Sequence, residues 1–162
     1  MRLNKLILKG FKSFANRTEI VFTPGVTTVV GPNGSGKSNI SDAVRWVLGE
    51  QSNKSLRANK ASDVIFQGTE EKKALGYAQV SIIFSNDDNS LPVEYQEVEV
   101  TRRMYRSGES EFLINNKKAR MKDVRELFLD TGVGKDGYSI IGQGRIDEIL
   151  SNKPEDRRAI FE

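Results

Sequence analysis

The stretch VTTVVGPNGSGKSNISDAVRWVLG, residues 26–49, is the main basis for predicting the fold of this chain. It begins with an apolar run at 26–30, continues through a cluster of small residues, and ends with apolar side chains at helical spacing. We therefore expect a strand over 26–30, then a tight loop, and then a half-buried helix over 38–48. Gly49 is placed to end that helix, because glycine readily adopts the left-handed conformation of a helix terminus.

Between the expected strand and helix, residues 31–38 read GPNGSGKS and match the phosphate-binding pattern G-x-x-x-x-G-K-[ST]. Several backbone N–H groups must meet the phosphate oxygens together, so side chains have to be small or absent at Gly34 and Gly36. The first turn of the helix adds free N–H donors and the positive end of the helix dipole. Lys37 can then reach the β- and γ-phosphates, and the Ser38 hydroxyl can ligate magnesium. The sequence thus predicts a P-loop NTPase rather than a coincidental glycine-rich turn.

The composition narrows the chemistry further. The chain has 162 residues, 37% of them hydrophobic, which suits one domain with one core. It contains no cysteine and no histidine, so disulfides, thiol chemistry and the usual zinc ligands are excluded. A metal would need oxygen ligands, which favours Mg²⁺. No apolar run reaches the length of a membrane helix and no signal peptide follows Met1, so we expect a cytoplasmic protein with no membrane partner.

The rest of the chain predicts an α/β fold, with a mixed sheet and the P-loop helix on one face. Residues 77–116 are expected to form an antiparallel subdomain, whose hairpin turns at Ser107-Gly108. Residues 51–76 are polar and irregular, apart from an apolar patch at 64–66. The other expected elements are strands at 3–8 and 20–22, a helix at 121–129, and a helix that begins at Pro154.

The interior of the loop, PNGS at 32–35, resembles that of the ATP-binding-cassette (ABC) superfamily more than that of kinases or small GTPases. Enzymes of this superfamily also need an acidic Walker B strand, which consists of apolar residues followed by Asp-Glu. The nearest candidate is LFLD at 127–130, which lacks the following Glu and has a spacing that suits a helix. The chain therefore has a phosphate-binding loop but no general base for the attack of water.

Several blocks together resemble one family. The chain is similar, over essentially its whole length, to the N-terminal half of the ABC-type ATPase head of SMC (structural maintenance of chromosomes) proteins, bacterial type. The blocks that carry the resemblance are LILKGFKSFANRTEI, GPNGSGKSNISDAVRWVLGEQSNKSLR, TRRMYRSGESEFLINN, YSIIGQGRIDEIL and KPEDRRAIFE.

This resemblance implies an architecture beyond the chain itself. Residues 1–162 would be half of a head, 154–162 would start the coiled coil, and the C-terminal half-head would supply the signature motif and Walker B. Two heads would sandwich two ATP molecules in a homodimer, together with a kleisin and its accessory subunit. Head engagement and hydrolysis would be coupled to DNA entrapment and loop extrusion at the nucleoid.

The resemblance also implies roles for particular residues. Gln143 falls on the Q-loop glutamine, which touches Mg²⁺ and the attacking water. Arg57 is a candidate arginine finger, although a solvated arginine or a DNA contact would also explain it. Lys12, Ser13 and Asp63 fall where the family approaches the α-phosphate, ribose or base, although such strand-end residues are equally often structural. The Walker A positions are Pro32, Asn33, Gly34, Ser35, Gly36, Lys37, Ser38 and Asn39.

The charge distribution raises the question of nucleic acid. The net charge is only +3, but residues 101–125 hold eight bases and three acids, whereas 86–99 hold five acids and no base. Such basic runs are usually a solvated surface, and they suit phosphate contacts without sequence specificity. With the family resemblance, we expect Lys60, Arg120 and Lys122 to contribute to binding of double-stranded DNA.

Two other functions fit parts of the sequence. One is the head of a related ABC-type ATPase of DNA double-strand-break repair. The other is a non-catalytic nucleic-acid-binding module with a vestigial P-loop, against which the intact Lys37 and Ser38 argue.

Overall fold

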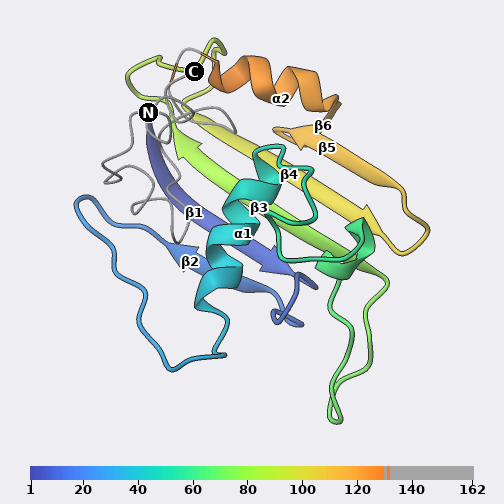
Figure 1. Cartoon of the computed structure of the whole chain (residues 1–162). Coiled ribbons are helices and arrows are strands. Elements are labelled where there is room, and N and C mark those ends of the chain that lie inside the picture. The colour runs from blue at the N-terminus through green and yellow to red at the C-terminus, as the bar shows by residue number, and fades with distance from the viewer. Residues whose placement is uncertain (130, 132–162) are drawn as a thin grey trace, which may run out of the picture.

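The computed structural model describes residues 1–129 and 131. They form a six-stranded sheet in the order β2-β1-β3-β4-β5-β6, with helix α1 across one face and α2 beside the β5–β6 edge (Figure 1). The elements are β1 (Arg2–Lys9), β2 (Thr18–Val21), α1 (Lys37–Val47), the 3₁₀ helix η1 (Ala61–Val64), β3 (Tyr77–Ser85), β4 (Glu97–Tyr105), β5 (Ser110–Ile114), β6 (Lys117–Ala119) and α2 (Met121–Phe128).

The core lies between α1 and the face of the sheet that it covers. Alternate residues of the central strands point to this face, because side chains of a strand alternate between its two sides. Leu6 of β1, Ile82 of β3 and Val100 of β4 are cross-strand neighbours and are at most 1% exposed. Ala43 and Trp46 of α1 are buried just as completely. Burying each large apolar side chain stabilises the fold by roughly 1.5–3 kcal/mol, so this layer holds α1 on the sheet.

Several predicted elements are confirmed. The helix after the P-loop ends at Val47, and Gly49 follows its C-cap Leu48, with φ 103° and its N–H donated to the carbonyl of Trp46 at 3.1 Å. The hairpin turns where expected, since Gly108 has φ 92° and donates to the carbonyl of Tyr105 at 2.9 Å. The helix α2 contains residues 127–128, so this part of the rejected Walker B candidate is helical.

The strand expected over 26–30 is not formed, and that prediction is wrong. Val26 and Val30 are 95% and 83% exposed, in a loop that runs beside the sheet (Figure 1). A strand needs a neighbour to pair its N–H and C=O groups. Both sides of β1 are occupied, by β2 and β3, and no strand pairs with 26–30 in the part of the chain that the structure describes.

The sheet also differs from the expected mixed sheet. Every strand pairing among the described residues is antiparallel. The strands expected to form a subdomain at 77–116 are joined to β1 and β2 in the same sheet, through the long β1–β3 pairing. Parallel strands need crossover connections, and α1 instead packs onto a sheet built from hairpins and longer antiparallel returns.

Arg102 of β4 anchors the end of α1 to the sheet. The residue is 6% exposed, and its guanidinium donates through Nη1 to the carbonyls of Trp46 and Glu50, at 2.9 and 2.8 Å. It also lies 4.6 Å from the ring of Trp46 and 4.9 Å from that of Phe112. Burial lowers the pKa of Arg102 to about 10, which leaves it charged at neutral pH. A buried cation therefore satisfies carbonyls at the negative end of the helix.

Two sequence predictions fall outside the described residues: the role of Gln143 and the helix at 154–162. Within the described residues, no helix has the length and hydropathy needed to span a bilayer.

Candidate nucleotide site

The loop at 31–36 leads directly into the first turn of α1, as the phosphate-binding pattern requires. Gly36 is the N-cap of α1 and has φ 94°, and Gly34 has φ 82°, both conformations that favour glycine. A Cβ on Gly36 would lie 2.7 Å from Ser13 Oγ, so the Ser13 hydroxyl would have to shift to admit a side chain. The loop therefore brings the N-terminus of α1 against the turn that follows β1.

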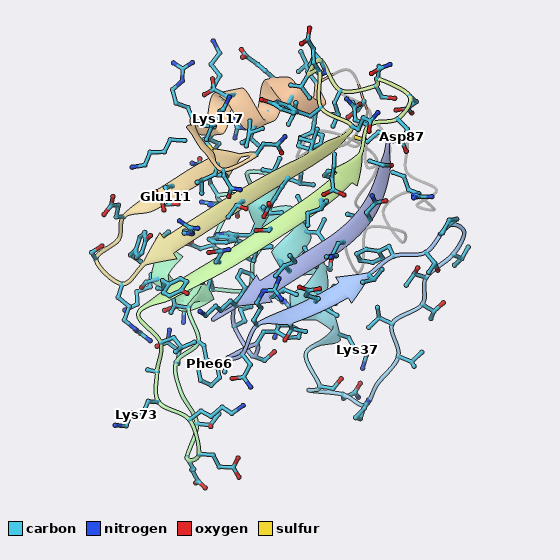
Figure 2. All side chains as sticks on the ribbon, turned by 180° about the vertical axis from the view of Figure 1, so that it is seen from behind. Lys37, Phe66, Lys73, Asp87, Glu111 and Lys117 are labelled. Carbon is cyan, nitrogen blue, oxygen red and sulfur yellow. The ribbon has the colours of Figure 1, made fainter. Side chains whose placement is uncertain are left out.

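Lys37 lies at the first residue of α1, at the foot of the helix (Figure 2). Its ammonium donates to the carbonyls of Gly31 and Pro32, the latter at 2.7 Å. An ammonium has three donors, and charged phosphate oxygens are stronger acceptors than carbonyls. The side chain therefore already lies over the loop that would hold phosphates, and the neutral partners can give way to a triphosphate.

The turn after β1 contacts α1 through side chains that the sequence singled out. Asn39 Nδ2 donates to Ser13 Oγ at 2.9 Å, and Arg57 Nη2 donates to Asn39 Oδ1 at 3.3 Å. The backbone N–H of Lys12 donates to the carbonyl of Val64 at 2.7 Å, which fixes the turn against η1. These contacts connect three segments that are far apart in the sequence.

The same segments, together with residues 65–69, line an open pocket of about 510 Å³. Five residues predicted from the sequence line it, which confirms that they come together, while their contacts with nucleotide stay a prediction. Its lining comprises Lys12, Ser13, Asn39, Arg57, Asp63, Ile65, Phe66, Gln67, Gly68 and Thr69.

Asp63 has a structural role in addition to its place in the pocket lining. Its Oδ2 accepts from the backbone N–H groups of Asn59 and Lys60, both at 3.0 Å. This is the capping contact that satisfies free N–H groups at the start of η1. The structural alternative considered for this residue is therefore present in the fold.

Sequence reasoning missed Asp42, which lies at the centre of a cluster of three cations: Lys12, Arg45 and Arg57. Its carboxylate is completely buried in α1 and accepts from Lys12 Nζ at 2.5 Å, Arg45 Nη2 at 2.8 Å and Arg57 Nη2 at 2.6 Å. The available signal was an acid next to Ala43 and four residues before Trp46, on the apolar face of the helix. A charged residue in that position needs partners, because an unpaired buried charge is costly.

The predicted DNA-binding cations lie in two places. Lys60 directly precedes η1, and Ile65 directly follows it. Ile65 forms a β-bridge with Phe11, so Lys60 lies on the β1 side of the sheet. Arg120 directly follows β6, and three strands stand between β1 and β6 in the sheet. The structure therefore does not gather these cations into one cluster.

The two cations on the α2 side have acidic neighbours. Arg120 Nη2 lies 2.8 Å from Asp123 Oδ1, and Lys122 Nζ lies 3.4 Å from Glu126 Oε1. Hydrogen bonds with Arg120 lower the pKa of Asp123. Both cations are more than 70% exposed at their side chains, at 79% and 74%, so they remain open to a phosphate backbone.

Metal binding would depend on the nucleotide. Among residues 1–129 and 131, no group of three acidic side chains could hold a metal ion. Ser38 is exposed at the second residue of α1, where its hydroxyl is free to face a phosphate-bound Mg²⁺. The donor set thus fits a metal that arrives with a triphosphate.

Residues 2–143 match the family model of the RecF/RecN/SMC N-terminal domain. The chain belongs to this family. One relative, the chromosome partition protein Smc of Clostridium kluyveri, is 62% identical over 162 residues, which is 100% of this chain and 14% of that protein. The chain therefore spans about one seventh of the length of that relative.

Solved structures of SMC heads have the same fold. A structure from a study of ATP-driven dimerisation and DNA-stimulated activation of SMC ATPases superposes with a TM-score of 0.92 at 38% identity, over 99% of this chain and 98% of that one. The Smc head of Pyrococcus furiosus, bound to the C-terminal domain of ScpA, gives 0.89 at 40% identity, over 98% of this chain and 40% of that one. The fold is therefore that of an SMC-type ATPase head, and the relatives favour the SMC assignment over the repair ATPase.

Proposed function

We propose that the chain is the ATP-binding half of the head of a chromosome condensation and segregation ATPase of the SMC type. The observation that carries the proposal is the GPNGSGKS loop at the start of α1, beside a pocket lined by Lys12, Ser13, Asn39 and Arg57. ATP-driven head engagement and hydrolysis would then be coupled to DNA entrapment and loop extrusion.

The residues at the site divide the work of binding. Backbone N–H groups of residues 32–39 surround the phosphates, and Lys37 exchanges its loop carbonyls for the β- and γ-phosphates. Ser38 and Gln143 hold Mg²⁺, which when bound neutralises charge on the β- and γ-phosphates. Arg57 stabilises charge that develops on the phosphate, and Gln143 orients the attacking water.

The remaining parts of the reaction come from partners. The C-terminal half-head supplies Walker B and the signature motif, and a second head of the same protein completes each ATP site. The Pyrococcus furiosus head binds the C-terminal domain of ScpA, which supports a kleisin partner for this protein as well. The accessory subunit of the kleisin is the further partner that we expect. The expected location is the cytoplasm, at the nucleoid.

The decisive test replaces Lys37 with Ile in the full-length protein. Lys37 is the first residue of α1. Loss of its ammonium should lower ATP turnover by at least about 100-fold, because this positive charge no longer compensates the negative charge on the transferred phosphoryl group. Lys118→Ile on the β6 edge, whose side chain is 86% exposed, is the matched control and should keep wild-type turnover. Appreciable ATPase activity of residues 1–162 alone would contradict the shared catalytic site.

DNA binding is tested by charge reversal. Lys60, Arg120 and Lys122 are replaced together with Glu, and affinity for a non-specific duplex is measured over a series of salt concentrations. Each lost phosphate contact should reduce the magnitude of the salt slope by about 0.9. Unchanged affinity and slope would remove these residues from the DNA surface.

A further inference from the structure

The buried carboxylate of Asp42 pairs with three cations, two of which come from segments outside its own helix. Oδ2 accepts from Lys12 Nζ at 2.5 Å and from Arg57 at 2.6 and 3.2 Å, through Nη2 and Nε. Oδ1 accepts from Arg45 Nη2 at 2.8 Å. One carboxylate of α1 thus holds cations from the β1 turn and from the segment after the helix.

Two of these cations face the pocket, and the third does not. Lys12 and Arg57 belong to the pocket lining, whereas Arg45 is absent from it. The side chain of Lys12 is 11% exposed and that of Arg57 is 52% exposed. The guanidinium of Arg57 is therefore paired with Asp42 and still accessible to solvent. Asp42 therefore connects the interior of the fold to the charged wall of the pocket.

The backbone at both pocket cations is held in an uncommon conformation. Lys12 has φ 48° and Arg57 has φ 51°, values that residues with a Cβ seldom adopt. Such conformations persist where the surroundings determine them, and they cluster at ligand sites. The turn that contains Lys12 and the turn that contains Arg57 both contact the carboxylate of Asp42.

Electrostatics explains why the two cations need this partner. Both approach the same oxygen, so their charges repel each other at short range in a partly water-excluded site. A buried carboxylate between them offsets the repulsion and fixes both directions of approach. Without it, the exposed guanidinium would move away from the ammonium into solvent.

We propose that Asp42 is a positioning residue for the ATPase reaction: it holds Arg57 beside Lys12, in one orientation at the pocket, before nucleotide arrives. This inference rests on the proposed function. Asp42 does not touch the reacting atoms and acts through Arg57. A purely structural Asp42 would instead stabilise α1, for which its contact with Arg45 one turn along the helix would suffice.

The test is a double-mutant cycle in the full-length protein. Asp42→Asn keeps the shape and removes the charge, and it should lower kcat about tenfold or more while KM for ATP stays unchanged or falls. In the background of Arg57→Ala, the same substitution should change kcat by less than about twofold, because the residue through which it acts is gone. Independent, multiplicative effects would overturn the proposal.

Arg45→Ala is the matched control. It removes a contact with the same carboxylate from a residue outside the pocket lining, and kcat should stay within about twofold of wild type. A loss of kcat equal to that of Asp42→Asn would show that α1 stability, and not the position of Arg57, is responsible. If Asp42→Asn does not fold, Asp42→Glu keeps the charge but displaces it, and the same fall in kcat with KM retained is expected.

A second readout does not depend on turnover. In a crystal structure of the nucleotide-free Asp42→Asn protein, the guanidinium of Arg57 should have left its 3.3 Å contact with Asn39 Oδ1. An unchanged Arg57 would overturn the inference whatever the kinetics show. If the wild-type protein hydrolyses no ATP, the proposed function fails, while the position of Arg57 still decides the role of Asp42.

Discussion

At the scale of single residues, Gly36 shows how the phosphate loop depends on a missing side chain. Its φ of 94° is strained for any residue with a Cβ, and that Cβ would lie 2.7 Å from Ser13 Oγ. The glycine thus brings together two segments, the P-loop and the turn after β1. Its chemistry was readable from the sequence because the phosphate-binding pattern is local.

The substitution Gly36→Ala separates strain from function. It should destabilise the protein by about 1 kcal/mol or more and weaken ATP binding, because a φ of 94° is unfavourable for alanine and the added Cβ would displace the Ser13 hydroxyl. Gly25→Ala is the control, since Gly25 has φ 98° with no atom within 4 Å of an added Cβ. Thermal melts should show a loss in both variants, and nucleotide titration a loss in Gly36→Ala alone. Equal ATP affinity in the two would contradict a binding role for the loop.

Asp42 illustrates what residue types cannot reveal. Its partners Lys12 and Arg57 are 30 and 15 positions away in the sequence, so no local pattern connects them. The family resemblance marked Arg57 as a candidate arginine finger, and the structure adds the carboxylate with which it pairs.

At the scale of elements, the direction of α1 is set at its two ends. The P-loop fixes the start, and Arg102 of β4 binds the carbonyls of Trp46 and Glu50 at the end. The guanidinium between two aromatic rings fills the space that an aliphatic core residue would otherwise occupy. The nucleotide site is thus connected to the sheet through the helix.

Arg102→Met should therefore destabilise the head by about 3 kcal/mol, because two buried carbonyls lose their charged donor. At this chain length we expect a fall in Tm of roughly 6–12 °C. Arg103→Met is the matched control on the neighbouring residue of β4: its ion pair with Glu111 is partly exposed, and its loss should cost under about 1 kcal/mol. Similar Tm values for the two variants would show that Arg102 does not anchor α1.

The segment 26–30 shows the limit of element prediction. Its valines have strand composition, yet the described residues provide no strand to pair with them, and two of these side chains remain more than 80% exposed, at 95% and 83%. β propensity records fit to a sheet surface rather than an intrinsic preference of the backbone. The segment therefore has residues typical of a strand but pairs with no strand of the described sheet.

At the scale of the whole molecule, these exposed valines bear on the proposed pairing with a C-terminal half-head. Val21, Val26, Val29 and Val30 are all exposed, on or just after the edge strand β2. Exposed apolar side chains of this kind mark a surface that another chain segment covers. We expect the C-terminal half-head to provide that cover.

Hydrogen exchange tests this expectation. Adding the C-terminal half-head to residues 1–162 should slow amide exchange at 26–30 by about 100-fold or more, because the backbone gains hydrogen-bonded partners. Residues 69–73, an exposed loop at the other side of the pocket, serve as the internal control and should keep their rate. Unchanged exchange at 26–30 upon complex formation would contradict a strand pairing there.

Local sequence patterns were enough to predict the phosphate loop, the helix that follows it, the hairpin at Ser107-Gly108 and α2, because each depends on contacts between near neighbours. The family resemblance also singled out five residues that line the pocket: Lys12, Ser13, Asn39, Arg57 and Asp63. Three features became visible only in the folded chain: among the described residues the sheet is antiparallel throughout, no described strand pairs with 26–30, and Asp42 and Arg102 make buried contacts with distant segments. The reason is physical: strand pairing and buried charges are settled by partners far away in the sequence, and a local pattern carries no record of them.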